Sequence, residues 1–148
     1  MRLWHKDLIP YLPKLQLLSQ WRECCCIAKN IADNGTPNHI LVNKIMDYNF
    51  KMFYDYIFLV INEIKRRGYK INKNSEERCF ENFRKMIEEK PWNFYPTNDL
   101  YSEWHDKRYL KQCLFNLEEK AMCGGIPKEE WKIIWNKFGK QFDLWYEE

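Results

Sequence analysis

Residues 53–71 read FYDYIFLVINEIKRRGYKI, and this stretch decides the fold class. Its apolar side chains recur three or four positions apart, which is the spacing of one face of an α-helix; they are Phe53, Ile57, Val60, Ile61 and Ile64. Basic side chains crowd the end of the pattern, and Gly68 suits the left-handed position just beyond a helix terminus. The stretch therefore predicts an amphipathic helix with one buried face.

The same kind of pattern recurs on both sides of this helix. The other predicted helices cover residues 13–30, 76–89, 98–123 and 127–145. The predicted apolar face of the first comprises Leu18, Trp21, Cys25 and Ala28. Asn98 is a good N-terminal cap, and Pro127 suits the first turn of a helix. Residues 33–39, DNGTPNH, are typical of a loop.

No strand-like alternation persists beyond a few residues. We therefore expect an all-α fold of about four to five helices with an irregular N-terminal segment. The length of 148 residues suits one domain, since about 100–200 residues per domain is typical. Within this single domain, residues 1–148, we expect residues 123–148 to form a C-terminal helical extension.

The composition excludes several classes of protein. With 45% apolar and 17% aromatic residues the chain is able to bury a core, which argues against disorder. No uncharged apolar run approaches the roughly 18 residues that span a bilayer, so no membrane partner is expected. The opening MRLWHKDLIP lacks the long apolar stretch of a signal peptide. The 6 cysteines are then expected to be reduced thiols in a cytoplasmic protein.

The charge is unevenly distributed although the net charge is only +3. Residues 1–30 carry five basic and two acidic side chains, and residues 51–73 carry six basic and two acidic ones. The excess of positive charge in these two stretches creates an electrostatic field that is able to hold a polyanion such as nucleic acid. The alternative is an ordinary solvated helix surface.

Most generic chemistry motifs are missing from the sequence. It has no Gly-rich phosphate loop, no GxSxG, no CxxC and no HExxH motif. Cys24, Cys25 and Cys26 are consecutive, so on a helix they point about 100° apart and do not face one metal ion together. We expect one or two of them in the core and one exposed, and no metal or cofactor. The aromatic side chains of the last predicted helix are expected in the core rather than as a platform for bases.

One ordered combination of segments goes further. The chain begins Met-Arg-Leu-Trp, continues with Trp-Arg-Glu at residues 21–23 and with residues 53–71, and reads LEEK at residues 117–120. This order and spacing resembles the pyrimidine-dimer DNA glycosylase (endonuclease V) family, and most closely a bacterial branch that begins MRLWH and continues with RECC. The resemblance covers most of residues 1–71 and returns near residues 117–120. No single motif in it is diagnostic.

The resemblance implies a fold, a reaction and a set of residues. Family members are compact all-α enzymes that act on damaged duplex DNA, and we expect the chain to work as a monomer. The implied function is excision of a damaged pyrimidine of the dimer type by a DNA repair glycosylase with AP-lyase activity, through a Schiff base of the N-terminal α-amine. Glu23 would complete the catalytic site. Arg2, Arg22 and Lys120 match the cationic positions of the family.

An α-amine suits this chemistry because the nucleophile must be unprotonated. Such amines have pKa values of about 7.7–8.0, against about 10.4 for lysine. At pH 7.4 roughly a quarter of an ordinary α-amine is neutral, against roughly one part in a thousand for lysine. A carboxylate beside it stabilises positive charge on the sugar and then helps to remove a sugar proton.

The departures from the family pattern also carry predictions. Residue 2 is Arg, and methionine aminopeptidases trim only before small side chains, so Met1 is expected to stay and to supply the nucleophilic amine. Two family arginines are replaced, by Cys26 and Asn116. Each lost phosphate contact flattens the log–log salt dependence of DNA binding by about one unit. The basic residues of the predicted fourth helix are expected to compensate as DNA contacts: Lys107, Arg108 and Lys111.

Alternatives remain open at several positions. Glu23 also fits a surface carboxylate paired with Arg22 or Lys29, and Trp4 fits either an anchor of the N-terminus or a pocket wall. Residues 65–67 either bind the DNA backbone or stabilise the end of a helix through a favourable interaction with its dipole. At the level of the whole chain, the alternatives are a catalytically inactive nucleic-acid-binding helical module and a helical interaction protein that uses its Trp-rich last helix.

Overall fold

A computed structural model describes residues 1–147, which fold entirely as helices and irregular segments with no strand. The elements are a 3₁₀ helix η1 (Lys6–Tyr11), α1 (Lys14–Asn34), a 3₁₀ helix η2 (Asn43–Asp47), α2 (Phe50–Arg66), α3 (Lys73–Glu89), a 3₁₀ turn η3 (Pro91–Asn93), α4 (Lys107–Met122) and α5 (Lys128–Phe138). The prediction of an all-α fold is confirmed. No helix in the described part of the chain is long and apolar enough to cross a membrane.

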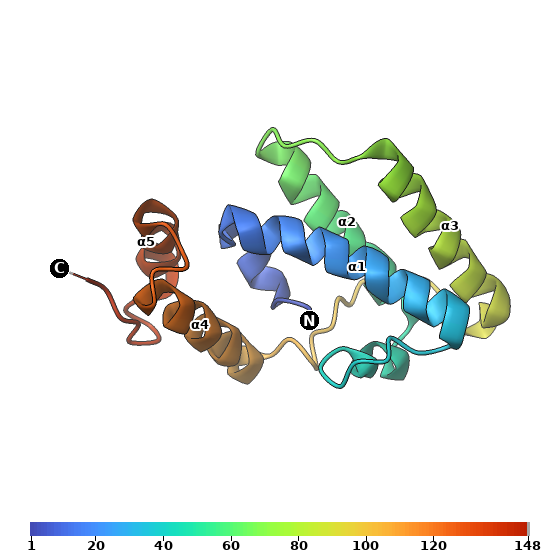
Figure 1. The fold of residues 1–148 in the computed structure, drawn as a ribbon. Helices are drawn as coiled ribbons and strands as arrows, with labels where there is room; N and C mark the ends of the chain where they lie inside the picture. Colours follow the sequence, from blue (N-terminus) through green and yellow to red (C-terminus); the bar gives the residue numbers. More distant parts are fainter. Residues whose placement is uncertain (148) are drawn as a thin grey trace.

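Helix α1 lies across α2 and α3, while α4 and α5 lie on the other side of the N-terminal segment (Figure 1). The apolar face predicted for α2 is buried throughout, from Phe53 to Ile64. On α1 the predicted residues Trp21 and Ala28 are buried, whereas Leu18 and Cys25 are only half-buried, because the buried face is centred on Leu17, Cys24 and Ile31. Burying each large aliphatic side chain contributes about 1.5–3 kcal/mol to stability. The two helices therefore share the main core.

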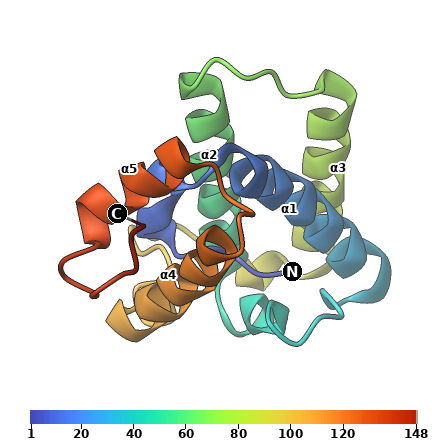
Figure 2. The same ribbon diagram turned by 60° about the vertical axis from the view of Figure 1, so that its left-hand side comes forward.

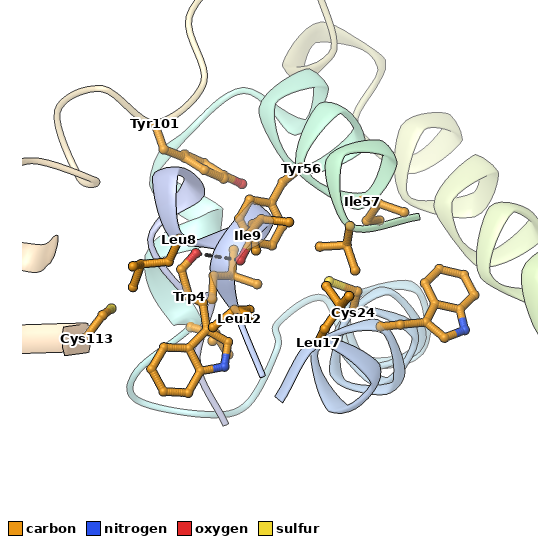
Figure 3. Close-up of a cluster of buried hydrophobic side chains, with 14 of the residues drawn as sticks. Trp4, Leu8, Ile9, Leu12, Leu17, Cys24, Tyr56, Ile57, Tyr101 and Cys113 are labelled. Atoms are coloured by element: carbon orange, nitrogen blue, oxygen red, sulfur yellow. Dashed lines mark hydrogen bonds between the residues drawn. The ribbon is translucent and has the colours of Figure 1, made fainter. Parts of the chain in front are cut away.

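The N-terminal segment is part of this core. Leu3, Leu8 and Ile9 are fully buried, and Trp4 is 4% exposed. The backbone that carries these side chains runs between α1, α2 and α4, and α4 comes forward in the rotated view (Figure 2). In the close-up, Trp4 and Ile9 lie against Tyr56 of α2 (Figure 3). Of the two alternatives left open for Trp4, its burial supports the anchor of the N-terminus.

Several predicted helix bounds were wrong, and local hydrogen bonding explains two of them. Helix α4 begins at Lys107 rather than after Asn98, because the Asp106 carboxylate accepts the Tyr109 N–H and caps it. Helix α3 begins at Lys73 rather than at residue 76, because Asn72 caps it through the Ser75 N–H.

The helical C-terminal extension was predicted too long. Helix α5 ends at Phe138, and the chain then turns and runs on without helical structure through residue 147. Phe142 and Leu144 are nevertheless buried there, and the Trp131 indole of α5 donates to the Trp145 carbonyl oxygen at 3.0 Å. The last predicted helix supplies core aromatics as expected, because Trp131 and Phe138 are buried.

The basic end of α2 holds the N-terminal segment. The Arg67 guanidinium donates to Glu63 at 2.7 Å and to the Leu12 carbonyl oxygen at 2.7 Å, and it also reaches the Ile9 and Pro10 carbonyl oxygens. Glu63 is only 7% exposed, and burial by itself would raise the pKa of its carboxyl, but the hydrogen bonds from Arg66 and Arg67 together outweigh burial and hold this pKa below the usual value. Arg67 is therefore engaged within the fold.

Two buried histidines hold the first turn of this segment. The Nδ1 atom of His105 accepts the Lys6 N–H at 2.9 Å, and the Nδ1 atom of His5 accepts the Asp7 N–H at 3.1 Å. Burial lowers the pKa of both rings, and that of His105 falls to about 3. Both rings therefore act as neutral acceptors near pH 7.

Replacing Arg67 is expected to destabilise the fold far more than replacing its neighbour. Arg67→Ala removes the buried one of the two guanidinium groups that bind the Glu63 carboxylate, and it leaves three carbonyl oxygens without their donor. This should cost roughly 2–4 kcal/mol of unfolding free energy. Arg66 binds the same carboxylate but is 65% exposed, so its ion pair is screened by water and Arg66→Ala should destabilise the fold much less. Urea unfolding of both variants measures the difference, and equal losses would contradict this assignment.

Acid is expected to weaken the fold through His105. The pKa of this ring is about 3 in the folded state, against the ordinary 6.5. Between pH 3 and pH 6.5 the ring is therefore protonated in the unfolded chain and neutral in the folded chain. The free energy of unfolding therefore falls as the pH drops from 6.5 toward 3. Between pH 7 and pH 5 the loss should be up to about 2 kcal/mol greater than in His105→Asn, which keeps an acceptor for Lys6 but does not titrate. Parallel urea titrations at the two pH values test this.

Candidate active site

The backbone of the first four residues is held by side chains from α1, α2 and α4. On α1, the fully buried Gln20 accepts the Trp4 N–H with Oε1 at 2.7 Å and donates from Nε2 to the Arg2 carbonyl oxygen at 2.9 Å. On α2, the Tyr56 hydroxyl donates to the Trp4 carbonyl oxygen at 2.6 Å (Figure 3). On α4, the Tyr109 hydroxyl donates to the Leu3 carbonyl oxygen at 2.5 Å. Unpaired buried backbone groups are costly, so these bonds fix the path of the chain terminus.

This path brings the chain terminus to Glu23. The α-amine nitrogen of Met1 lies 3.8 Å from Glu23 Oε1. Glu23 lies one helical turn after Gln20 on α1, and the Gln20 amide nitrogen is 3.4 Å from Glu23 Oε2. One buried amide therefore contacts both the terminal backbone and the carboxylate, which fixes their relative positions.

The electrostatics of Glu23 are set by two opposing effects. Burial raises the pKa of its carboxyl above the ordinary glutamate value. The Met1 ammonium, Lys120, a protonated His39 and Arg2 act in the opposite direction, and burial prevails. The carboxyl is thus more basic than an exposed glutamate while facing several cations.

Trp4 lies between two of those cations. The Arg2 guanidinium carbon is 5.3 Å from the centre of its ring, and the Lys120 Nζ is 5.4 Å away. Cations at this distance from an indole face are attracted by its electron density, by about 0.5–2 kcal/mol. The buried ring therefore positions one cation from the terminal segment and one from α4 beside the carboxylate.

Four of the predicted site residues come together in this way: Met1, Arg2, Glu23 and Lys120. Arg22 lies apart from them on the exposed surface of α1, where its Nη2 donates to Ser19 Oγ at 3.0 Å. Glu23 pairs with the chain terminus rather than with Arg22 or Lys29, and Lys29 lies instead 3.9 Å from Asp33.

The three cations predicted on the fourth helix are all exposed on α4. Lys107 and Arg108 lie in its first turn, about 20 Å along the axis from Lys120. Lys111 lies 5.6 Å from the ring of Phe115. Phe115 helps to line a depression together with Arg2, Leu41, Tyr109 and Gln112. Of the three, Lys111 is therefore the one connected to the surroundings of the terminus.

The residues that hold the terminus were not among the predicted site residues. Gln20 is the one polar residue among the buried positions of α1. Its place on that face could have indicated a structural role, because a buried amide must find hydrogen-bond partners. Tyr56 lies on the apolar face of α2, where a hydroxyl also needs a partner. Tyr109 and His39 gave no such signal, since their proximity depends on how α4 and the α1–α2 connection pack.

The cysteines follow the prediction made for them. Cys24 is buried, Cys25 is half-buried and Cys26 is exposed, so they do not form a common site. No group of three or more metal-ligating side chains occurs among residues 1–147.

A comparison with known protein families gives a match for this chain. The profile of the family described as pyrimidine dimer DNA glycosylase matches residues 1–77, just over half of the 148 residues. No curated protein and no solved structure gives a match. Met1 and Glu23 lie within the matched part, whereas Tyr109 and Lys120 lie beyond it. The chain therefore belongs to the pyrimidine dimer DNA glycosylase family, whose members are DNA repair glycosylases acting on DNA.

Proposed function

We propose that this protein excises a damaged pyrimidine of the dimer type from duplex DNA and then nicks the strand, with the α-amine of Met1 as nucleophile. The observation that carries the proposal is the 3.8 Å separation between that amine and the Glu23 carboxylate. An amine held beside a half-buried carboxyl group, in a chain of this family, suits covalent attack on a sugar carbon.

In the first step the unprotonated amine attacks C1′ of the damaged nucleotide. The new N–C1′ bond forms as the bond between C1′ and the base breaks, and the base leaves with the bonding electrons and takes up a proton. The nitrogen lone pair then forms a double bond to C1′ as the C1′–O4′ bond breaks, O4′ takes up a proton to become a hydroxyl, and the ring opens to an imine that is protonated at nitrogen. The Glu23 carboxylate stabilises the positive charge that develops on the sugar.

In the second step Glu23 accepts a proton from C2′. The electrons of that C–H bond shift toward the iminium and expel the 3′ phosphate by breaking the C3′–O bond, which nicks the strand. Water then hydrolyses the imine and frees the amine. Burial raises the pKa of Glu23, which makes its carboxylate a stronger base than an exposed glutamate.

The surrounding cations are proposed to hold the DNA backbone. Arg2, Lys120 and Lys111 are the inner set, because they lie beside Glu23 or beside the adjoining depression. Arg22, Lys107 and Arg108 are exposed and form an outer set that meets phosphates farther along the duplex. We propose that the protein acts as a monomer and without a cofactor.

Borohydride trapping on DNA with an abasic site tests the nucleophile. Untagged protein is expected to form a covalent adduct. One residue added before Met1 moves the amine by up to about 3.6 Å, which should slow adduct formation by about a hundredfold. Glu23→Gln should slow strand nicking by about a hundredfold to ten-thousandfold because the base is lost, while binding to the DNA persists. Intact mass verifies that each protein begins where intended.

Two outcomes would overturn the proposal. If the extended protein reacts as fast as the untagged one, another amine is the nucleophile. If untagged protein binds duplex DNA in a salt-sensitive way but gives no adduct, the chain is a catalytically inactive nucleic-acid-binding module.

Gln20 is proposed as a positioning residue for the amine. Gln20→Met removes the partners of the Trp4 N–H and the Arg2 carbonyl oxygen but leaves the bonds from Tyr56 and Tyr109. The rate of adduct formation at saturating DNA should fall roughly tenfold to a hundredfold, because small misplacements of a nucleophile are costly. The dissociation constant for DNA should change little. A loss confined to DNA affinity would show instead that Gln20 serves binding.

A further inference from the structure

The connection between α1 and η2 carries a rigid turn. The His39 N–H donates to the Asn43 side chain at 2.9 Å, and the His39 carbonyl oxygen accepts the N–H groups of Val42 and Asn43 at 3.0 and 2.8 Å. Val42 and Ile45 are buried in the core directly after it. The turn is therefore fixed by its own hydrogen bonds on one side and by buried anchors on the other.

Two aliphatic side chains project from the tip of this turn. Ile40 is 85% exposed and Leu41 is 50% exposed, although the neighbouring residues before and after them are mostly polar. A rigid turn that presents adjacent aliphatic side chains to water gains nothing from them in folding, because their apolar surface stays hydrated. Contiguous exposed apolar surface of this kind marks a contact surface.

The turn lies beside the candidate active site. In both ribbon views the α1–α2 connection runs close to the N-terminus (Figures 1 and 2). His39, at the start of the turn, is among the groups that act on the pKa of the Glu23 carboxyl. Leu41 lines one depression together with Arg2, Tyr109 and Phe115. The aliphatic tip thus stands at the edge of the place where the damaged nucleotide must meet the Met1 amine.

The surroundings of the tip are basic. Arg2 lines the same depression, Lys111 lies 5.6 Å from the ring of Phe115, which also lines it, and the exposed Lys44 follows the turn. An apolar projection flanked by cations is complementary to duplex DNA, whose apolar base stack is bordered by phosphates.

We propose that Ile40 and Leu41 form a wedge that enters the base stack of duplex DNA at the lesion. This inference rests on the proposed function. The C1′ atom of a stacked nucleotide is hidden, so the duplex must be opened before the Met1 amine reaches it. An aliphatic wedge occupies the space left in the stack and keeps it from closing, as apolar side chains do in proteins that kink DNA. The wedge is needed for duplex substrates and has no stack to open in a single strand.

The test compares two substrates and two variants. The first substrate is a duplex that contains a pyrimidine dimer, and the second is a single strand with one abasic site. The variant Ile40→Ala/Leu41→Ala shortens the tip and keeps the buried anchors Val42 and Ile45. Ile133→Ala is the control, because Ile133 is an aliphatic residue on α5 whose exposure (53%) is close to the 50% of Leu41. Melting temperatures verify that both variants fold.

The double variant should lose at least about tenfold more rate on the duplex than on the single strand, because unstacking is then unassisted. Ile133→Ala should keep the wild-type ratio of the two rates. A 2-aminopurine base next to a tetrahydrofuran abasic analogue in a duplex should brighten when wild-type protein binds, and much less with the double variant.

The possible results are distinguishable. An unchanged ratio of duplex to single-strand rates, together with unchanged 2-aminopurine fluorescence, would overturn the wedge while leaving the amine chemistry intact. If wild-type protein forms no adduct with either substrate, the proposed function is wrong. The fluorescence measurement then still decides whether the tip opens the duplex.

Discussion

The structure depends on the hydrogen bonding of the buried segment that directly follows the chain terminus. Leu3 and Trp4 bury their side chains, and this takes their peptide groups out of water. Those groups must find partners inside the protein, because an unpaired buried N–H or carbonyl is costly. Gln20, Tyr56 and Tyr109 supply the partners from three different helices. A chain end, which is ordinarily the most mobile part of a protein, is thereby held in one position.

Holding the terminus in one position also shapes the electrostatics next to it. The Glu23 carboxyl shares its surroundings with the Met1 ammonium, Arg2 and Lys120, which favour its charged form, and with buried apolar groups, which disfavour it. Burial prevails, so the carboxyl keeps a raised affinity for a proton beside groups suited to meeting a polyanion. Trp4 connects the two roles, since the same buried ring anchors the terminus and positions Arg2 and Lys120.

The C-terminal part of the chain completes this arrangement. The family match ends at residue 77, yet Tyr109 and Lys120 reach the terminal segment from α4. Helix α5 also contacts the first part of the chain, where the Lys14 N–H donates to Glu130 Oε1 at 2.9 Å. The pairing of Met1 with Glu23 lies within the matched part, and its surroundings are built by the part outside it.

The sequence by itself determined the helical fold, because the spacing of apolar residues along α2 and α5 is a local property of the chain. It also indicated Met1, Glu23 and the cations nearest to them, through their order along the chain. Helix starts were less predictable, since Asp106 and Asn98 are equally good caps and only packing of the intervening residues chose between them. Tertiary structure alone decided the burial of Gln20, the approach of Tyr109 and His39, and the engagement of Arg67 within the fold. These contacts join residues far apart in the chain, and local sequence carries no information about which distant side chain will meet a buried polar group.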